Sequence, residues 1–327
     1  NKLKEPRESH IFFVIRDDFL KHDVLVQTSD TTWQAYNGYG GYTTYGSFDH
    51  PYTHGPNATV DYAALKPGQP PRRAFKASYA RPLVTRDYRP VNMPFNSEYP
   101  LIRFLESLGY DAAYTTDVDT ARRGHLVLNA KVFVSVGHDE YWSGEQRRNV
   151  EAARDAGVNL MFLAGNNVYW KIRWEDSFRT MVVYKESQSI SKIDPNLTTW
   201  TGTFRDARAI NPEGAWPENS LLGSIFTVNA QREDALEVPA VFSRLRFWRS
   251  TPVAALPLPV AGLATSSPVR YVSNKGVLGH EWNEDVDNGF RPAGNIRLSR
   301  TEVDSVQYLM DHGGTFDVGS ACHHMTL

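Results

Sequence analysis

"KVFVSVGHDEYWSGEQ", residues 131–146, is the stretch that decides the fold class. Its apolar run ends at Gly137, and a histidine, two acids, a tyrosine and a tryptophan follow directly. Ser143 and Gln146 then match a capping box, in which each side chain bonds the backbone N–H of the other residue, so a helix is expected to begin there. A short apolar run that leads straight into a helix predicts a buried strand.

The sequence on both sides of this stretch repeats the alternation. Upstream, residues 97–109 predict a helix with Ser97 as its N-cap, and residues 110–115 predict a strand after it. Downstream, residues 158–164 form another apolar run of strand length. Apolar strands that alternate with helices are typical of a parallel sheet with helices on both faces. We therefore expect a three-layer α/β core over about residues 95–185.

The pattern outside this core is looser and richer in β-like pieces. Residues 29–46 are rich in Gly, Thr, Tyr and Trp and predict a long ordered loop, with a short helical turn near its start. Residues 186–327 predict β-rich and loop additions, and we expect one domain over residues 11–327. Short β-like runs are expected at residues 11–15, 24–27, 198–204 and 224–228.

Composition excludes several classes of protein. The chain has 327 residues and a formal net charge of −2, which argues against a nucleic-acid or polybasic membrane partner. No apolar run approaches the roughly 20 residues that span a bilayer, so no membrane partner is expected. The single cysteine, Cys322, excludes an intrachain disulfide. A Cys–His dyad with the histidines beside it is not expected, since neighbouring residues of a strand point to opposite faces.

The cellular location stays open at this stage. The first residue is asparagine and no signal-peptide pattern follows, so we expect a processed or trimmed product. We expect no targeting segment in this chain, and we expect either a cytoplasmic or an exported location.

Polar and aromatic residues follow two successive strands. Residues 138–142 come after one strand and residues 166–170 after the next. Ligands of parallel α/β sheets bind at the carboxyl ends of the strands, so we expect both segments to lie side by side at a site. The histidine, carboxylates and phenol of "HDEYW" suit either a metal or acid–base chemistry. The structural alternative is that Asp139 or Glu140 favours the helix N-terminus while the aromatic rings pack.

Other segments leave similar choices. Asn166 and Asn167 either satisfy the backbone of their loop or aim an amide into the site. The aromatic loop over residues 29–46 is either a packed lid or the wall of a pocket, and we favour the wall. His280 and Glu281 offer a ligand or base pair, although the acids after them lack the spacing of an EF-hand. The chain contains no Walker loop, GxGxxG, HExxH, CxxC or GxSxG pattern.

Several of these segments resemble one known family. "TTWQAYNGYGGYTTYG" (31–46), "VFVSVGHDEYWS" (132–143) and "GVNLMFLAGNNVYWK" (157–171) resemble the N,N-dimethylformamidase large (beta) subunit and, more closely, its uncharacterised relatives. The resemblance runs from about residue 11 to the end. It implies a glutamine-amidotransferase-like (flavodoxin-like) α/β core with β-rich additions. It also implies hydrolysis of a small formamide-type amide at an iron held by two tyrosines and a glutamate.

The resemblance carries over to individual residues. Tyr141 is the first expected ligand of the iron (Fe3+), and Tyr99 is the second by approximate spacing. Residues 196–206, where the glutamate is expected, contain none, so Glu281 is taken as the third ligand, with Glu186 as the other candidate. The residues expected to be catalytic are His138, Glu140 and Asn166. The expected substrate pocket is lined by Trp33, Tyr36, Tyr39, Trp142 and Trp170.

The resemblance also bears on partners and on alternatives. It implies a small second subunit, a homo-oligomer being the other option, and a chain that lacks the C-terminal end of the family. One alternative is a non-catalytic ligand-binding or structural module on the same scaffold. Another is a metal-free hydrolase in which His138 and Glu140 form an acid–base pair.

Overall fold

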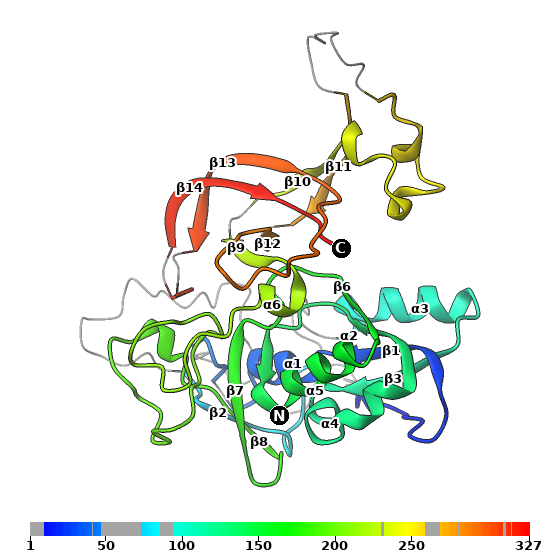
Figure 1. The fold of residues 1–327 in the computed structure, drawn as a ribbon. Helices are drawn as coiled ribbons and strands as arrows, with labels where there is room; N and C mark the ends of the chain where they lie inside the picture. The colour runs from blue at the N-terminus through cyan, green and yellow to red at the C-terminus, as the bar shows by residue number, and fades with distance from the viewer. Residues whose placement is uncertain are drawn as a thin grey trace, which may run out of the picture. The chain divides into compact units, whose positions relative to one another are not determined.

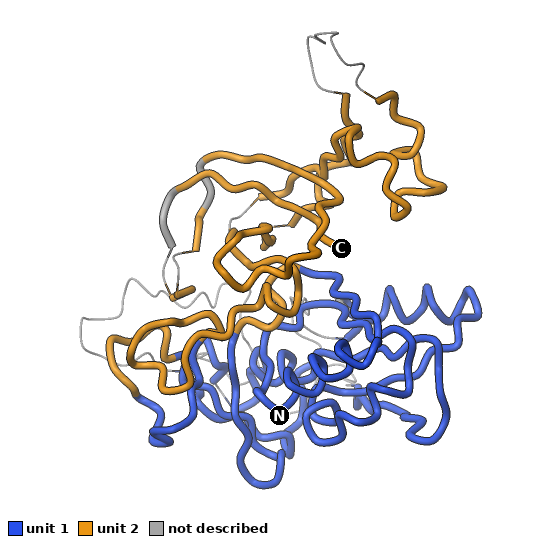
Figure 2. Tube along the Cα trace, in the orientation of Figure 1, with its two compact units in different colours: residues 1–164, 170–185, 193–202 blue, residues 165–169, 186–192, 203–327 orange. Residues whose placement is uncertain are grey.

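The computed structural model describes residues 10–40, 42–46, 73–85, 94–229, 232–258, 269–279, 281–309, 312–314 and 316–327. The chain divides into two compact units, which Figure 2 shows in different colours. Unit 1 comprises residues 1–164, 170–185 and 193–202, and unit 2 comprises residues 165–169, 186–192 and 203–327. The expectation of a single domain over residues 11–327 stays a prediction.

Unit 1 contains a parallel sheet, sheet A (Figure 1). Its strands are β1 (His22–Thr28), β3 (Ala112–Thr116), β4 (Ala130–Ser135) and β6 (Asn159–Phe162), in the order β3-β1-β4-β6. All their pairings are parallel, which confirms the expected α/β class. β1 is a central strand of the sheet, although it precedes residues 95–185, over which the sequence predicts the core.

The helices of unit 1 follow the strands. Helix α1 (Asp30–Tyr36) begins directly after β1, so the first part of the predicted loop over residues 29–46 is helical. Helix α3 (Tyr99–Ser107) is the predicted helix before β3, and its Leu101 and Leu105 belong to a core cluster with Val26 and Val134 of sheet A. The other helical segments of this unit are α2 (Pro94–Ser97), α4 (Asp117–Arg122), η2 (Gly124–Asn129) and α5 (Gly144–Asp155).

Two helix starts test the capping predictions. The capping box of Ser143 and Gln146 is confirmed at the start of α5, with both of its hydrogen bonds present. Ser97 as the N-cap of α3 is wrong, because Ser97 is the last residue of α2 and Glu98 occupies the N-cap position. The Glu98 backbone N–H bonds to the Pro94 oxygen, so the helical turn of α2 extends into the place where a cap was expected.

A second sheet of unit 1 has the order β2-β8-β7-β5. Its strands are β2 (Lys76–Ser78), β5 (Tyr141–Ser143), β7 (Trp170–Glu175) and β8 (Thr180–Val182). The pairing of β5 with β7 is parallel and the other pairings are antiparallel. This sheet joins the segment after β4 to the segment that contains Trp170, because Tyr141 pairs with Trp170.

Unit 2 is rich in β-structure, as the sequence predicts. Strands β9 (Ile225–Asn229), β12 (Glu281–Glu284), β13 (Thr301–Leu309) and β14 (Phe316–His323) form a closed barrel in the order β12-β14-β13-β9. Strands β10 (Asp234–Pro239) and β11 (Arg270–Leu278) form an antiparallel pair. The helical segments are η3 (Glu186–Gln188), α6 (Asn219–Leu222), η4 (Ala240–Phe242), η5 (Arg246–Trp248) and η6 (Pro252–Ala255). Val228, Trp248, Trp282 and Leu298 belong to the buried core of this unit.

Two of the expected β-runs are not strands. Residues 11–15 have no regular secondary structure, and residues 198–204 form turns with an isolated bridge residue. In the second segment the Asn196 side chain accepts hydrogen bonds from the backbone N–H groups of Thr198 and Thr199, which a strand would direct to a neighbouring strand. Among the described residues, no helix is both long enough and apolar enough to cross a membrane.

Candidate functional site

The topology of sheet A indicates a site at the carboxyl ends of its strands. From β1 the chain passes to β3 on one side and then to β4 on the other side, so the direction of winding reverses between β1 and β4. In open α/β sheets, ligands bind in the crevice outside the carboxyl ends of the strands at such a switch point. The residues that follow β1 and β4 therefore form the candidate site. The Ser29 hydroxyl ties the two segments together by donating to the Val136 oxygen at 3.0 Å.

Polar side chains converge on Glu140, just after β4. The Tyr45 hydroxyl donates to Glu140 Oε1 at 2.5 Å, and the Tyr36 hydroxyl lies 2.9 Å from Oε2. The two hydroxyls are 3.0 Å apart. His138 Nε2 lies 3.5 Å from Oε2, with 18% of the His138 side chain exposed against 4% of Glu140. We call Tyr36, Tyr45, His138 and Glu140 the tyrosine–carboxylate cluster.

Backbone contacts hold this cluster in place. Gly137 has a φ of +78°, a conformation that favours glycine, and it turns the chain out of β4. The Thr32 hydroxyl of α1 then accepts the Glu140 backbone N–H at 3.0 Å. The Glu140 carbonyl oxygen accepts the Trp170 N–H at 2.9 Å. The position of the carboxylate is therefore set from α1 on one side and from β7 on the other.

Burial shifts the ionisation of groups in and beside the cluster. It raises the pKa of Tyr45 well above its usual range, and the charge of Glu140 adds to the effect. Tyr45 is thus a neutral hydrogen-bond donor near pH 7. Lys185 is fully buried beside it, with Nζ 3.0 Å from the centre of the Tyr45 ring. Burial lowers the pKa of Lys185 well below its usual range, against the attraction of Glu140.

A layer of buried acids lies at the same ends of the strands. Asp139 accepts from Gln27 at 3.0 Å and from Ser135 at 2.7 Å, so it turns toward the sheet while the adjacent Glu140 joins the cluster. Asp117 accepts from Gln146 at 2.6 Å. Burial raises the pKa of Asp139 to about 6 and that of Asp30 to about 7. These acids hold the loops together. The motif "HDEYW" contains both Asp139 and Glu140, and its composition alone does not show that they have different roles.

The aromatic residues expected around a pocket have diverse surroundings. Trp33 is buried and donates its indole N–H to Glu98 at 2.8 Å. Trp142 is fully buried and packs near Phe162, and Trp170 lies 4.8 Å from the Lys185 amine. Tyr39 is 49% exposed. Of the expected pocket residues, the structure places Tyr36 directly in the tyrosine–carboxylate cluster.

The expected tyrosine ligands differ in environment. Tyr141 is fully buried beneath the cluster, with its ring 6.3 Å from that of Tyr45 and its hydroxyl 3.1 Å from the Thr44 hydroxyl. Tyr99 lies at the start of α3, 44% exposed, where its ring contacts Phe95. Sequence reasoning missed Tyr45, whose signal was its place in the same aromatic segment as Tyr36.

Asn166 and Glu281 come together within unit 2. Asn166 has a φ of +59°, and its side chain donates to Glu281 Oε1 at 3.1 Å. A Cβ atom on Gly165 would lie 2.5 Å from the Glu281 carbonyl oxygen, so only glycine permits this approach. The loop expected to carry a catalytic amide is therefore fastened to the start of β12. His280, the expected partner of Glu281, lies outside the described residues.

Unit 2 also contains a cysteine–histidine contact that the sequence does not predict. Cys322 Sγ lies 3.5 Å from Nε2 of His324, which is two residues further on and so on the same face. His324 Nδ1 accepts the Asp285 backbone N–H, which leaves the proton on Nε2, facing the sulfur. Burial raises the pKa of the Cys322 thiol. The histidine is thus a donor to this sulfur rather than a base for it.

The arrangement in unit 1 offers oxygen ligands and a proton carrier. Among the described residues, no group of three or more His, Cys, Asp or Glu side chains could hold a metal ion. The cluster supplies two phenols, a carboxylate and a partly exposed imidazole.

The chain matches a known family over nearly its whole length. The family model described as "N,N-dimethylformamidase beta subunit-like, C-terminal" matches residues 2–327. Among curated proteins, no sequence matches the chain. The chain therefore belongs to the N,N-dimethylformamidase beta subunit-like, C-terminal family.

Proposed function

We propose that this chain hydrolyses the C–N bond of a small formamide-type amide at the tyrosine–carboxylate cluster. The observation that carries the proposal is the convergence of Tyr36, Tyr45 and His138 on the buried Glu140 carboxylate, at the switch point of sheet A. Membership of the dimethylformamidase-like family favours an amide as the substrate. The reversal of winding between β1 and β4 supports a glutamine-amidotransferase-like, flavodoxin-like core.

We further propose that Tyr36, Tyr45 and Glu140 would hold the Fe3+ ion that the family resemblance implies. The Tyr45 hydroxyl lies 2.5 Å from Glu140 Oε1, the Tyr36 hydroxyl lies 2.9 Å from Oε2, and the two hydroxyls are 3.0 Å apart. Adjacent ligands of an octahedral ion with bonds of about 2.0 Å lie about 2.8 Å apart, so each phenol and its nearer carboxylate oxygen, and the two phenols, have the spacing of neighbouring ligands. Phenolate and carboxylate oxygens are hard donors, which suits a trivalent iron. We put this set forward in place of Tyr99, Tyr141 and Glu281, because the Tyr99 side chain is 44% exposed, the Tyr141 hydroxyl lies against that of Thr44, and the Glu281 carboxylate accepts from Asn166.

The chain's own residues supply the remaining chemistry. A bound Fe3+ ion would supply Lewis-acid polarisation of the amide carbonyl and would acidify water. His138 lies beside Glu140 with part of its ring exposed, so it can exchange a proton with solvent and deliver one to the leaving amine. The rings of Tyr36, Tyr45 and Tyr141 pack around the carboxylate and limit its contact with water. The family description names a beta subunit, and on that ground we propose a small second subunit as partner.

Metal content and the visible spectrum test the proposal. The protein prepared without chelators is expected to bind iron, to show a phenolate-to-iron charge-transfer band and to hydrolyse N,N-dimethylformamide. Tyr45→Phe and Glu140→Gln should each lower the iron content and reduce activity by about 100-fold or more. Tyr99→Phe is the matched control and should leave the band and the activity in place.

Other outcomes discriminate between the alternatives. Full iron content in Glu140→Gln, or loss of the band in Tyr99→Phe, would contradict the ligand set. Activity that survives chelation but is lost in His138→Ala would favour the metal-free hydrolase. If the protein binds the amide but does not hydrolyse it, the alternative of a non-catalytic ligand-binding module is favoured.

A further inference from the structure

Lys185 is a buried cation-forming residue that the proposed chemistry does not use. Its side chain is fully buried, and its amine lies 3.0 Å from the centre of the Tyr45 ring. The rings of Trp170 and Tyr141 lie 4.8 and 5.3 Å from the same nitrogen. Among the described residues, none forms a hydrogen bond with this amine. Within the described part of the chain, the Lys185 amine therefore contacts the faces of aromatic rings.

The backbone at Lys185 is held in an unusual conformation. Its φ is +50°, in the left-handed region that few residues with a side chain adopt. The Tyr184 N–H donates to the Thr201 hydroxyl at 3.2 Å, and Arg73 donates to the Tyr184 oxygen at 2.7 Å. Strained backbone of this kind persists only where the surroundings over-determine it, and such positions cluster at functional sites.

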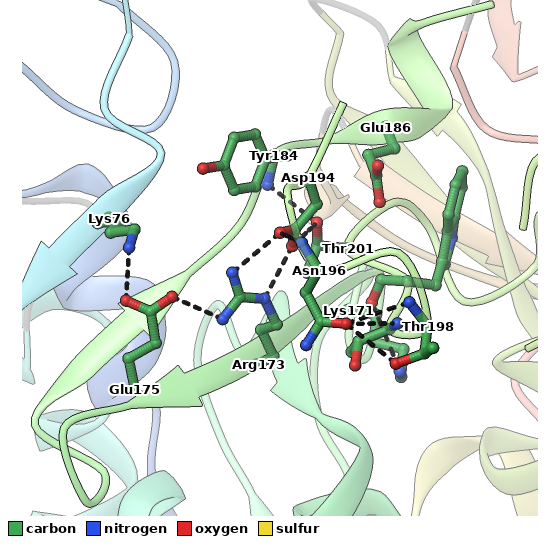
Figure 3. Close-up of polar contacts among 12 residues, drawn as sticks. Lys76, Lys171, Arg173, Glu175, Tyr184, Glu186, Asp194, Asn196, Thr198 and Thr201 are labelled. Carbon is green, nitrogen blue, oxygen red and sulfur yellow. Dashed lines mark hydrogen bonds and ion pairs between the residues drawn. The ribbon is translucent and has the colours of Figure 1, made fainter. Parts of the chain in front are cut away.

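The anchor of this backbone extends further, as Figure 3 shows. The Thr201 hydroxyl donates to the buried Asp194 carboxylate at 3.3 Å. Arg173 of β7 holds the same carboxylate with two hydrogen bonds of 2.8 and 2.9 Å. A bidentate ion pair with a buried carboxylate thus fixes the residues before Lys185, and through them the direction of its side chain.

Tyr45 is held at its backbone, at its hydroxyl and at its ring. Its backbone N–H bonds to the Thr43 hydroxyl at 3.1 Å, and its hydroxyl reaches Glu140 at 2.5 Å. Its ring is tilted by 33° against Tyr36 and stands edge-on to Tyr141, so the ring face is left to Lys185. The amine lies over this face, 3.0 Å from the ring centre, which fits an N–H group directed into the π-face.

We propose that Lys185 is a positioning residue that holds the Tyr45 phenol against Glu140 through N–H contact with the Tyr45 ring. This role rests on the proposed function, in which Tyr45 is a ligand of the iron. The contact itself is a property of the metal-free chain and is testable without iron or substrate.

Fluorine NMR of the metal-free protein tests the contact. The chain is labelled with 3-fluorotyrosine, and the Tyr45 resonance is assigned as the one missing from Tyr45→Phe. In Lys185→Met, which keeps the volume and removes the N–H groups, the Tyr45 resonance should shift and broaden while that of the distant Tyr114 stays in place. Lys171→Met, at another buried lysine of the unit, is the matched control and should leave Tyr45 unchanged.

The result that overturns the proposal is a Tyr45 resonance in Lys185→Met that keeps its wild-type position and width. If this variant does not fold, Lys185→Gln decides, because glutamine keeps N–H donors on a side chain that is one atom shorter. A Tyr45 resonance near its wild-type position in Lys185→Gln supports the proposal, and one at the position of free fluorotyrosine contradicts it. Neither result affects the iron-binding test, so the proposed function is tested separately from the role of Lys185.

Discussion

Glu140 and Asp139 are adjacent carboxylates with opposite surroundings. Glu140 meets two phenols and an imidazole, whereas Asp139 accepts hydrogen bonds from Gln27 and Ser135 within sheet A. Successive side chains of an extended segment point to opposite sides, so one acid of "HDEYW" faces the site and the other faces the protein. The same alternation leaves His138 on the side of Glu140.

His138 gives a prediction at the residue scale. His138→Gln keeps the size of the side chain and removes its ability to carry a proton, so kcat should fall by about 100-fold to 10,000-fold. Iron content should stay near that of the wild type, since His138 is not in the proposed ligand set. Steady-state kinetics and metal analysis on the same sample check both expectations. An unchanged kcat would show that another group moves the proton.

At the scale of elements, the segment between β4 and α5, which contains β5, joins the site to sheet A. The capping box of Ser143 and Gln146 fixes the start of α5, and Gln146 also donates to Asp117 at 2.6 Å. The helix start is therefore tied to the segment that follows β3. Such a local device stabilises the element on which the site residues depend.

The cap gives a stability prediction. Ser143→Ala removes the side-chain acceptor of the Gln146 N–H and should lower the free energy of unfolding by about 1 kcal/mol. Ser107→Ala, at the exposed end of α3, is the control and should change it by less than about 0.5 kcal/mol. Urea denaturation followed by circular dichroism compares the two variants. Equal midpoints for Ser143→Ala and the wild type would mean that the cap contributes nothing.

At the scale of the whole molecule, buried acids make the stability of the chain depend on pH. Burial raises the pKa of Asp30 and that of Glu98 to about 7 each, against usual values of 3.8 and 4.5. The folded state thus holds protons that the unfolded state releases between about pH 4 and pH 7. Stability from these groups is present below pH 4 and is lost as the pH rises to 7, by up to about 1.4 kcal/mol per pH unit and group.

Thermal denaturation between pH 5 and pH 8 checks this dependence. The buried acids should lower the melting temperature as the pH rises from 5 to 7, against an opposite contribution below about pH 6.5 from His323 and His324, whose pKa burial lowers to about 4. Asp30→Asn keeps the shape of the side chain and removes one of the titrating groups, so its decline should be shallower. Asp155→Asn, at an exposed position of α5, is the control and should follow the wild type. A steeper decline in Asp30→Asn would contradict the assignment.

Local patterns made parts of the fold predictable. The strand at β4, the capping box, the helix at α3 and its end at Gly109 follow from apolar runs, caps and a left-handed glycine, which act within a few residues. The prediction of a strand at residues 198–204 was wrong, because the backbone N–H groups of Thr198 and Thr199 donate to the Asn196 side chain instead of to a neighbouring strand. The place of β1 in the middle of sheet A was also not predictable, since its short run carries no sign of its neighbours.

The sequence by itself determined the parallel α/β class, the strand before "HDEYW", the capped helix after it and the family of the chain. Only the tertiary structure decided which residues meet at Glu140. Tyr36 and Tyr45 lie 104 and 95 residues before it, and Lys185 approaches from beyond β8. Such contacts depend on the order of strands in the sheet, which brings the ends of β1 and β4 together. No pattern confined to neighbouring residues encodes that order.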